Sequence, residues 1–400
     1  MFTPSPNLQF ADIKSLSQLD SMDSRGKNLN TYFCIAVVVL LLNINNYRDN
    51  ILLINDKIYG PSVGTPTRVI IDCLGTDKNL YTYIYDKSNK TKNIEGNRLF
   101  GVYPPFSSGW FINTTFQGII FRRFKSYAKE KSKTSLIHYT SQQVKPFNFG
   151  NSTVTVHDLV PILFPNETSK TVYKMTQKNL MFYKKLPIVM TVSNFIRKSL
   201  IDNGFVGRIH VIYNPANRDF FPIEVSRNQL RKKLHLPEQK KLILSVSANY
   251  PRKNLKMIES TMDTLGNDYS LVRVGTPLKN SINFANISTQ QLNELYNACD
   301  VFFIPSTYEG FGLPVLEAFS SGIPVVASDI EVFKEISEGS AILCPQDPKI
   351  YGNAIKQAID NRNEIRLKGL ERAKFFSIEN FCKQLKLFYG EAFSIYGIDA

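Results

Sequence analysis

The sequence predicts an α/β protein of two doubly wound, Rossmann-like domains that face each other across a central cleft. Short apolar runs alternate with longer amphipathic segments, which is typical of parallel sheets covered by helices. A chain of 400 residues with 43% hydrophobic residues can build about two cores, at roughly 100–200 residues per domain. A polar stretch after Asn214-Pro215 separates two series of apolar runs, so we place a domain boundary near residue 215.

The first domain, residues 1–214, contains apolar runs that predict strands, and helical patterns lie between most of them. These runs are residues 50–55, 68–73, 135–140, 152–158, 187–193 and 208–214. Residues 32–42 are also apolar, but eleven residues fall short of the ~20 that a membrane-spanning helix needs. We expect a buried element there.

The second domain is predicted over residues 215–385, and residues 386–400 are expected to form a helix that packs back toward the first domain. Its predicted strands are residues 242–247, 269–275, 300–306 and 323–328. Asn254 is placed to cap a helix over 255–265, and Ser288 with Gln291 has the spacing of a capping box. Ligands of such sheets collect at the carboxyl ends of the strands.

Charge and cysteine usage limit the partners and the compartment. The 48 Lys and Arg against 34 Asp and Glu give a formal charge of +14, which favours anionic partners such as nucleotides, nucleic acid or acidic lipid. A nucleic-acid partner is disfavoured because no recognition motif is present. The five cysteines are scattered and show no CxxC pair, so a reducing, cytoplasmic location fits best.

The stretch "STYEGFGLPVLEAFSSGIPVVASD", residues 306–329, places Glu309 at the end of a strand and Glu317 one turn inside a helix. Pro314 suits the first turn of that helix and Gly322 suits its end. A helix N-terminus favours phosphate, and a carboxylate can accept two hydrogen bonds from a vicinal diol. Phosphate and the hydroxyls of a sugar or ribose are therefore candidate ligands; the alternative is that Glu309 is a solvated loop acid and Glu317 an exposed helix residue.

The order E-G-F-G-L-P-x-L-E followed by G-x-P-V-V-A-S resembles the Glu-x7-Glu signature of family 4 retaining glycosyltransferases, which have the GT-B fold. By that resemblance Glu309 contacts the hydroxyls of the transferred sugar and Glu317 contacts the nucleotide ribose. The segment between them would lie along the donor. Its expected donor-binding residues are Gly310, Phe311, Gly312, Leu313, Val315 and Leu316.

Two further segments resemble the same family. "SVSANYPRKNLK" places Arg252 and Lys253 between a strand and a helix, where the family's cations neutralise the leaving nucleoside diphosphate. "TVTVHDLVPILFP" places His157 and Asp158 at a strand end, and the family's histidine lies near the donor sugar. Together the matches run from about residue 135 to 347.

The resemblance implies transfer of a mannose- or glucose-type hexose from a nucleotide diphosphate sugar to a sugar or lipid-linked acceptor, with retention of configuration. The sequence contains no DxD triplet, so no metal is expected, and Arg252 and Lys253 would stabilise the developing charge instead. A catalytically silent subunit that binds nucleotide sugar is the alternative.

The segment 116–133 contains the basic run "FRRFKSYAKEKSK". It is either a helix lying on the anionic inner face of the membrane or a solvated helix face.

Overall fold

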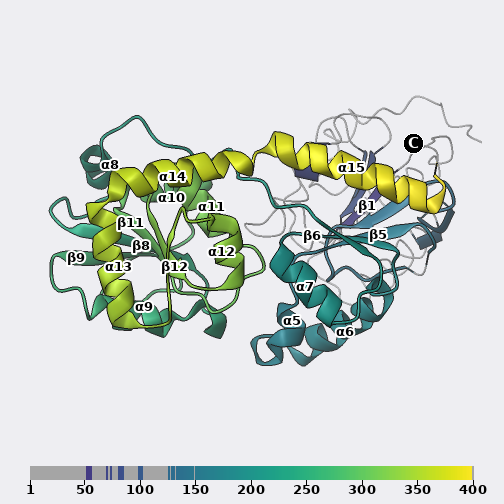
Figure 1. Cartoon of the computed structure of the whole chain (residues 1–400), viewed down its shortest axis with the longest axis horizontal. Coiled ribbons are helices and arrows are strands. Elements are labelled where there is room, and N and C mark those ends of the chain that lie inside the picture. Colours follow the sequence, from purple (N-terminus) through teal and green to yellow (C-terminus); the bar gives the residue numbers. More distant parts are fainter. Residues whose placement is uncertain are drawn as a thin grey trace, which may run out of the picture. The chain divides into compact units, whose positions relative to one another are not determined.

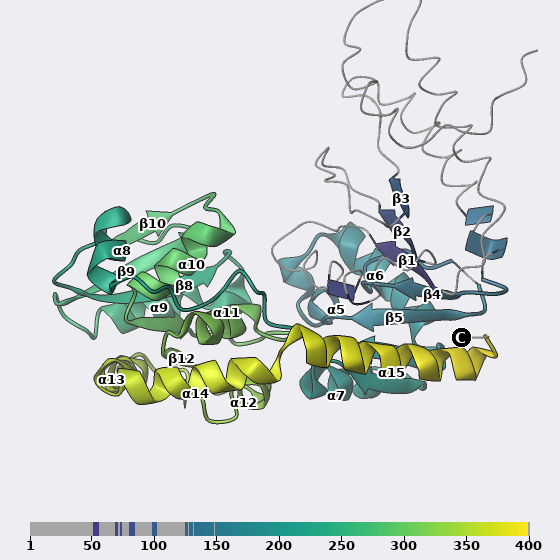
Figure 2. The same cartoon turned by 90° about the horizontal axis from the view of Figure 1, so that it is seen from above.

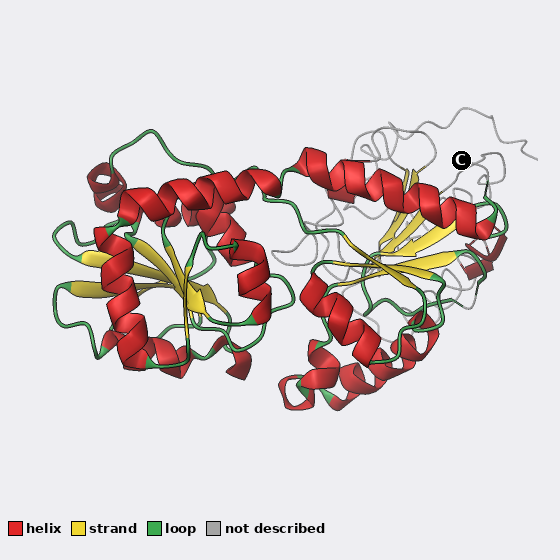
Figure 3. Cartoon of the chain, in the orientation of Figure 1, coloured by secondary structure: helices red, strands yellow, loops and turns green. Residues whose placement is uncertain are grey.

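The computed structural model describes residues 132–147 and 149–398, and before them only short segments: 51–55, 69–70, 73, 80–84, 98–101, 125–126 and 128–130. The strands of these residues form two parallel sheets, each flanked by helices (Figures 1 and 3).

The first sheet has the order β3-β2-β1-β4-β5-β6-β7, with every neighbouring pair parallel. Chain order therefore reverses between β1 and β4, as in a doubly wound fold. The strands are β1 (Ile51–Asn55), β2 (Leu80–Ile84), β3 (Arg98–Gly101), β4 (Leu136–Tyr139), β5 (Ser152–Val156), β6 (Ile188–Thr191) and β7 (Arg208–Val211).

The second sheet repeats this plan with the order β10-β9-β8-β11-β12-β13, again all parallel. Here chain order reverses between β8 and β11, at the centre of the sheet. The strands are β8 (Lys241–Ser247), β9 (Tyr269–Gly275), β10 (Ser281–Phe284), β11 (Val301–Ile304), β12 (Val325–Ser328) and β13 (Ile342–Cys344).

Alternating side chains fix which helices cover which face of the second sheet. Phe303 packs with Tyr351 in the core beneath α9 (Leu255–Met262) and α13 (Pro348–Asp360). Its neighbour Phe302 packs with Tyr296 and Phe319 on the other face, beneath α10 (Thr289–Ala298) and α11 (Leu313–Ser321). The remaining helices are α8 (Arg227–Lys233), α12 (Glu331–Ser337) and α14 (Arg362–Phe375), and η3 (Pro251–Lys253) is a single 3-10 turn.

One face of the first sheet is covered by helices that lie between its own strands in the sequence, and the other face by the C-terminal helix. The local elements are α5 (Val160–Leu163), η2 (Pro165–Glu167), α6 (Lys170–Tyr183) and α7 (Asn194–Asp202). Helix α15 (Ile378–Tyr396) runs along the opposite face (Figure 2). Its Phe388 shares a core with Leu53 and Met190. The sequence predicts that this helix begins at residue 386, but in the structure it begins at Ile378.

A buried polar contact fastens α15 to β4. His138 is fully buried; Nδ1 lies 2.6 Å from the Tyr389 hydroxyl and Nε2 lies 2.8 Å from Oγ1 of Thr155. Burial, followed by the charge of His157, lowers the pKa of His138 to about 3. The ring is therefore neutral at physiological pH.

The expectation of a strand over residues 68–73 is wrong. Residues 69, 70 and 73 are helical rather than extended, and Val69 and Ile70 are buried against the face that α15 covers. An apolar run this short does not distinguish a buried strand from a buried helix. Cys73 and Cys382 form a disulfide across 309 residues of sequence, so scattered spacing gave no sign of the pair.

Candidate functional site

The candidate site lies at the carboxyl ends of β8 and β11, the two strands between which chain order reverses. This is where ligands bind in open parallel sheets. Thr307, after β11, donates its main-chain N–H to the carbonyl of Arg252, after β8, at 2.8 Å. The loops that carry the predicted cations and the predicted glutamate are therefore joined directly.

Lys253 and Glu309 form an ion pair, with 2.5 Å between Nζ and Oε1. Their side chains are 15% and 11% exposed, so the pair is largely removed from water. A cation and a carboxylate thus lie next to each other at this strand end. Each neutralises the charge of the other.

Arg252 pairs with Glu167, a residue that the sequence did not single out. The Glu167 carboxylate binds the guanidinium and also accepts the main-chain N–H of Arg252 at 2.9 Å. The guanidinium carbon lies 4.5 Å from the centre of the Tyr250 ring. No motif marks Glu167, which follows the "LFP" segment of the first domain.

The glycines between the two glutamates permit close approach. A Cβ at Gly310 would lie 2.5 Å from the carbonyl oxygen of His157, and Ser193 Oγ donates to the Gly310 carbonyl at 2.9 Å. Gly312 has φ +107° at the start of α11, and a Cβ there would meet the Phe333 ring at 2.9 Å. A larger residue at either position would displace the loop.

Helix α11 begins at Leu313 with a proline in its first turn and ends at Gly322 in the left-handed conformation, as the sequence predicts. Val315 and Leu316 are buried in the core, and Phe311 is also buried. Their side chains therefore support the loop. The main-chain groups of this segment are suitable for the donor contacts that the resemblance implies.

Glu317 is half-buried, and its Oε2 accepts a hydrogen bond from the Tyr296 hydroxyl at 3.0 Å. Burial raises the pKa of this carboxyl to about 7, and the hydrogen bond from Tyr296 acts in the opposite direction. Oε1 has no hydrogen-bond partner among the described residues. One carboxylate oxygen is thus held in place while the other can accept from a ligand.

His157 is held by main-chain and amide groups of the loop after β4. Nε2 lies 2.8 Å from the carbonyl of Thr140, which requires the proton on Nε2, and Gln142 accepts the His157 main-chain N–H at 3.1 Å. Burial is the main cause that raises the pKa of the neighbouring Asp158, whose Oδ1 accepts from the N–H of Val160 at 3.0 Å. These contacts fix the backbone that lies against Gly310.

Side chains from two other strand ends brace the site. Gln346, after β13, joins Asn254 at 2.8 Å, Ser328 at 2.9 Å and the carbonyl of Pro305 at 3.3 Å. Asn254 has φ +52° and gives no side-chain cap to α9, so the predicted capping role is wrong. Its amide is instead used in this network.

Arg273 in β9 is fully buried without an acidic partner among the described residues. Its guanidinium binds the carbonyls of Ser245 and Val274 and Oγ of Ser247 at 2.9, 3.0 and 2.9 Å. Burial lowers its pKa to about 10, so the side chain stays charged at neutral pH. It brings a positive charge to the end of β8.

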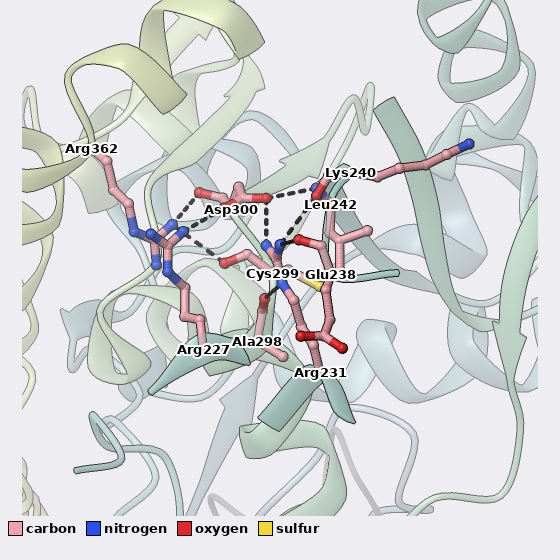
Figure 4. Close-up of polar contacts among 9 residues, drawn as sticks. All are labelled: Arg227, Arg231, Glu238, Lys240, Leu242, Ala298, Cys299, Asp300 and Arg362. Atoms are coloured by element: carbon pink, nitrogen blue, oxygen red, sulfur yellow. Dashed lines mark hydrogen bonds and ion pairs between the residues drawn. The ribbon is translucent and has the colours of Figure 1, made fainter. Parts of the chain in front are cut away.

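The opposite ends of β8 and β11 are fastened by Asp300 (Figure 4). Its carboxylate binds Arg227, Arg231 at 2.7 Å and the main-chain N–H of Leu242 at 2.7 Å. Arg362 donates to the carbonyl of Asp300. This network ties α8 and α14 to the amino-terminal ends of β8 and β11, opposite the strand ends that carry the candidate site.

The predicted membrane-contacting segment falls mostly outside the described residues. Residues 125, 126 and 128–130 are helical, and Lys125 and Lys129 are exposed. In the part of the chain that the structure describes, no helix combines the length and apolar character needed to cross a bilayer. The same residues contain no group of three or more His, Cys, Asp or Glu side chains placed to hold a metal ion.

Comparison with known sequences finds a family match for most of the second domain. Residues 226–374 match the family model described as glycosyl transferases group 1, and this segment includes Arg252, Lys253, Glu309 and Glu317. The O-antigen chain mannosyltransferase RfbU of Salmonella typhimurium is 31% identical over 52% of this chain. That match spans 60% of the RfbU chain. The O-antigen chain mannosyltransferase B of Escherichia coli is 27% identical over 60% of this chain and 70% of its own length.

Solved structures similar to this chain share its fold at low sequence identity. Sucrose-phosphate synthase from Thermosynechococcus elongatus has a TM-score of 0.67 at 19% identity, covering 87% of this chain and all of that one. WaaG, a glycosyltransferase involved in lipopolysaccharide biosynthesis, has a TM-score of 0.62 at 15% identity over the same shares. Anabaena HepE in complex with UDP and glucose has a TM-score of 0.64 at 16% identity, covering 86% of this chain and all of its own. The chain therefore has the GT-B fold of two Rossmann-like domains, and its residues 226–374 match the glycosyl transferases group 1 family.

Proposed function

We propose that the protein is a retaining glycosyltransferase of family 4 that moves a hexose from a nucleotide diphosphate sugar to an acceptor hydroxyl. The single observation that carries this proposal is the joined arrangement of Arg252, Lys253 and Glu309 at the centre of the second sheet. Two cations suit a diphosphate, and an adjacent carboxylate suits sugar hydroxyls. The family match of residues 226–374 supports the same activity.

In the proposed mechanism, Glu309 accepts hydrogen bonds from the sugar and Glu317 from the ribose diol. Arg252, Lys253 and the first amides of α11 stabilise the charge that develops on the leaving diphosphate. The departing phosphate oxygen takes the proton of the acceptor hydroxyl on the face that the leaving group vacates, so configuration is retained. His157 lies at the sugar end of the donor, and no metal is required.

The proposed substrates follow the similar proteins. RfbU and mannosyltransferase B are named for O-antigen mannosyl transfer, and HepE is in complex with UDP and glucose. We propose a mannose- or glucose-type donor and an acceptor in polysaccharide, glycolipid or lipid-linked oligosaccharide synthesis. The basic segment 121–133 would hold the protein on the anionic inner face of the membrane.

A thermal-shift screen tests the donor. GDP, UDP, ADP and their mannose and glucose conjugates are added to the full chain, because a ligand that binds only the native state raises its stability by mass action. We expect one nucleoside diphosphate and its sugar to raise the melting temperature. Arg252→Ala and Lys253→Ala should each reduce that rise. If no nucleotide stabilises the wild type, the proposed function is wrong.

A further inference from the structure

Both carboxylate oxygens of Glu167 contact Arg252. One oxygen of its carboxylate accepts the main-chain N–H of Arg252 at 2.9 Å, and the other pairs with Nη1 of the guanidinium. The Glu167 side chain is 4% exposed and that of Arg252 is 15% exposed. A single carboxylate therefore fixes both the backbone and the side chain of the proposed phosphate-binding arginine.

Other contacts complete the placement of Arg252. Its carbonyl accepts the N–H of Thr307 at 2.8 Å, so its main chain is held at both the N–H and the C=O. The Tyr250 ring lies against the guanidinium. A guanidinium has five N–H donors, and among the described residues a side chain binds only at Nη1. The remaining donors can serve a phosphate while Glu167 stays in contact.

The charges of the site predict which ion pair a ligand breaks. Arg252 and Lys253 are matched by Glu167 and Glu309, so a diphosphate that binds both cations competes with the two carboxylates. A buried carboxylate that loses its partner is strongly unfavourable. Glu167 is the least exposed of the four side chains and makes two bonds to Arg252, so its pair is the one that persists.

We propose that Glu167 is a positioning residue, which holds Arg252 with its unused N–H donors directed to the donor diphosphate. This inference rests on the proposed function, since it assumes that Arg252 binds phosphate. It also assigns different behaviour to the two ion pairs. Glu167 stays on Arg252 when the diphosphate binds, whereas Glu309 gives up Lys253.

The substitution Glu167→Gln distinguishes two effects of Glu167 on ligand binding: its placement of the Arg252 side chain and the repulsion between its negative charge and an anionic ligand. The amide oxygen can still accept from the Arg252 N–H, but the negative charge is lost. Removal of a nearby negative charge alone would tighten binding of an anion. If Glu167 positions Arg252, binding becomes weaker, and we expect the dissociation constant of the cognate nucleoside diphosphate, measured by calorimetry, to rise about tenfold.

A double-mutant cycle and a matched control exclude a general effect on folding. In an Arg252→Ala background, Glu167→Gln should change nucleoside diphosphate affinity by less than about twofold. The control Glu294→Gln also removes a buried carboxylate from an ion pair, with Lys233 at 2.8 Å, and should leave affinity unchanged. If Glu167→Gln does not fold, Glu167→Asp retains the charge on a shorter side chain and should weaken binding by a smaller factor.

The possible outcomes are distinct. Unchanged or tighter binding by a folded Glu167→Gln protein overturns the positioning role while the proposed function stands. An equal loss in the Arg252→Ala background also overturns it. Failure of the wild type to bind GDP, UDP and ADP overturns the proposed function, and this inference with it.

Discussion

The substitution Glu309→Gln should have opposite effects on nucleotide binding and on sugar transfer. Lys253 Nζ lies 2.5 Å from Oε1 of Glu309, in a pair whose side chains are 15% and 11% exposed. The glutamine keeps the shape of the side chain and removes its charge. Lys253 then lacks its carboxylate until a phosphate binds, so we expect tighter binding of nucleoside diphosphate.

The burial of the pair sets the size of this effect. An exposed ion pair contributes about 0–1 kcal/mol, and removal of one partner from a fully buried pair costs about 3–5 kcal/mol. A largely but incompletely buried pair lies between these limits. We therefore expect a gain of about 1.4 kcal/mol in nucleoside diphosphate binding, which is a tenfold lower dissociation constant. Turnover should fall because a charge-assisted hydrogen bond to the sugar, of about 1.5–3 kcal/mol, is lost.

Calorimetry with the nucleoside diphosphate and initial-rate measurements with the nucleotide sugar test the two effects on one preparation. Glu294→Gln again serves as the control, because it lies outside the loops after β8 and β11. A dissociation constant that is unchanged or higher in Glu309→Gln would refute the proposal that Lys253 leaves Glu309 and binds the phosphate when the nucleotide binds. Normal turnover would refute the role of Glu309 at the sugar.

Three further predictions address other parts of the molecule. Burial raises the pKa of Glu317 to about 7, and the ionised carboxylate is the stronger hydrogen-bond acceptor, so the affinity for the nucleotide sugar should increase as the pH rises through that value. In Glu317→Gln, isothermal titration should show weak binding that does not depend on pH in this range. Asp300→Ala leaves a buried arginine without its counter-ion and should lower the free energy of unfolding by about 3–5 kcal/mol in urea denaturation, and a loss below about 1 kcal/mol would contradict the network of Figure 4. Flotation with acidic liposomes should recover the wild type but not a variant whose basic segment 121–133 carries three Lys/Arg→Glu changes, and equal recovery would remove the membrane proposal. The three changed residues are Arg122, Arg123 and Lys125.

The sequence predicted the sheets best where strands are apolar and buried. Strands β8, β9, β11 and β12 lie within or close to the predicted runs, and the capping box of Ser288 and Gln291 forms at α10. The short or polar strands β2, β3, β10 and β13 were missed. Their pairing with neighbours, rather than their own apolar pattern, makes them strands.

The motif of the candidate site was legible because its residues are close in sequence and follow strands whose ends meet. Contacts between residues far apart in the sequence could not be predicted. Glu167 reaches Arg252 over 85 residues, and Cys73 reaches Cys382 over 309. Such contacts depend on how the elements pack, which local patterns do not encode. Asn254 shows the same limit, since Gln346 competes successfully for the side chain that was expected to cap a helix.

Release of nucleoside diphosphate from a nucleotide sugar, measured with and without candidate acceptors, tests the central claim most directly. The account predicts acceptor-dependent release from the donor that stabilises the wild type, and a rate at least tenfold lower after Lys253→Ala, since one charge-assisted contact to the leaving group is lost. Binding of the donor without release, for every acceptor tried, would contradict the claim and favour a catalytically silent subunit. Undiminished release by Lys253→Ala would contradict the role given to the cations.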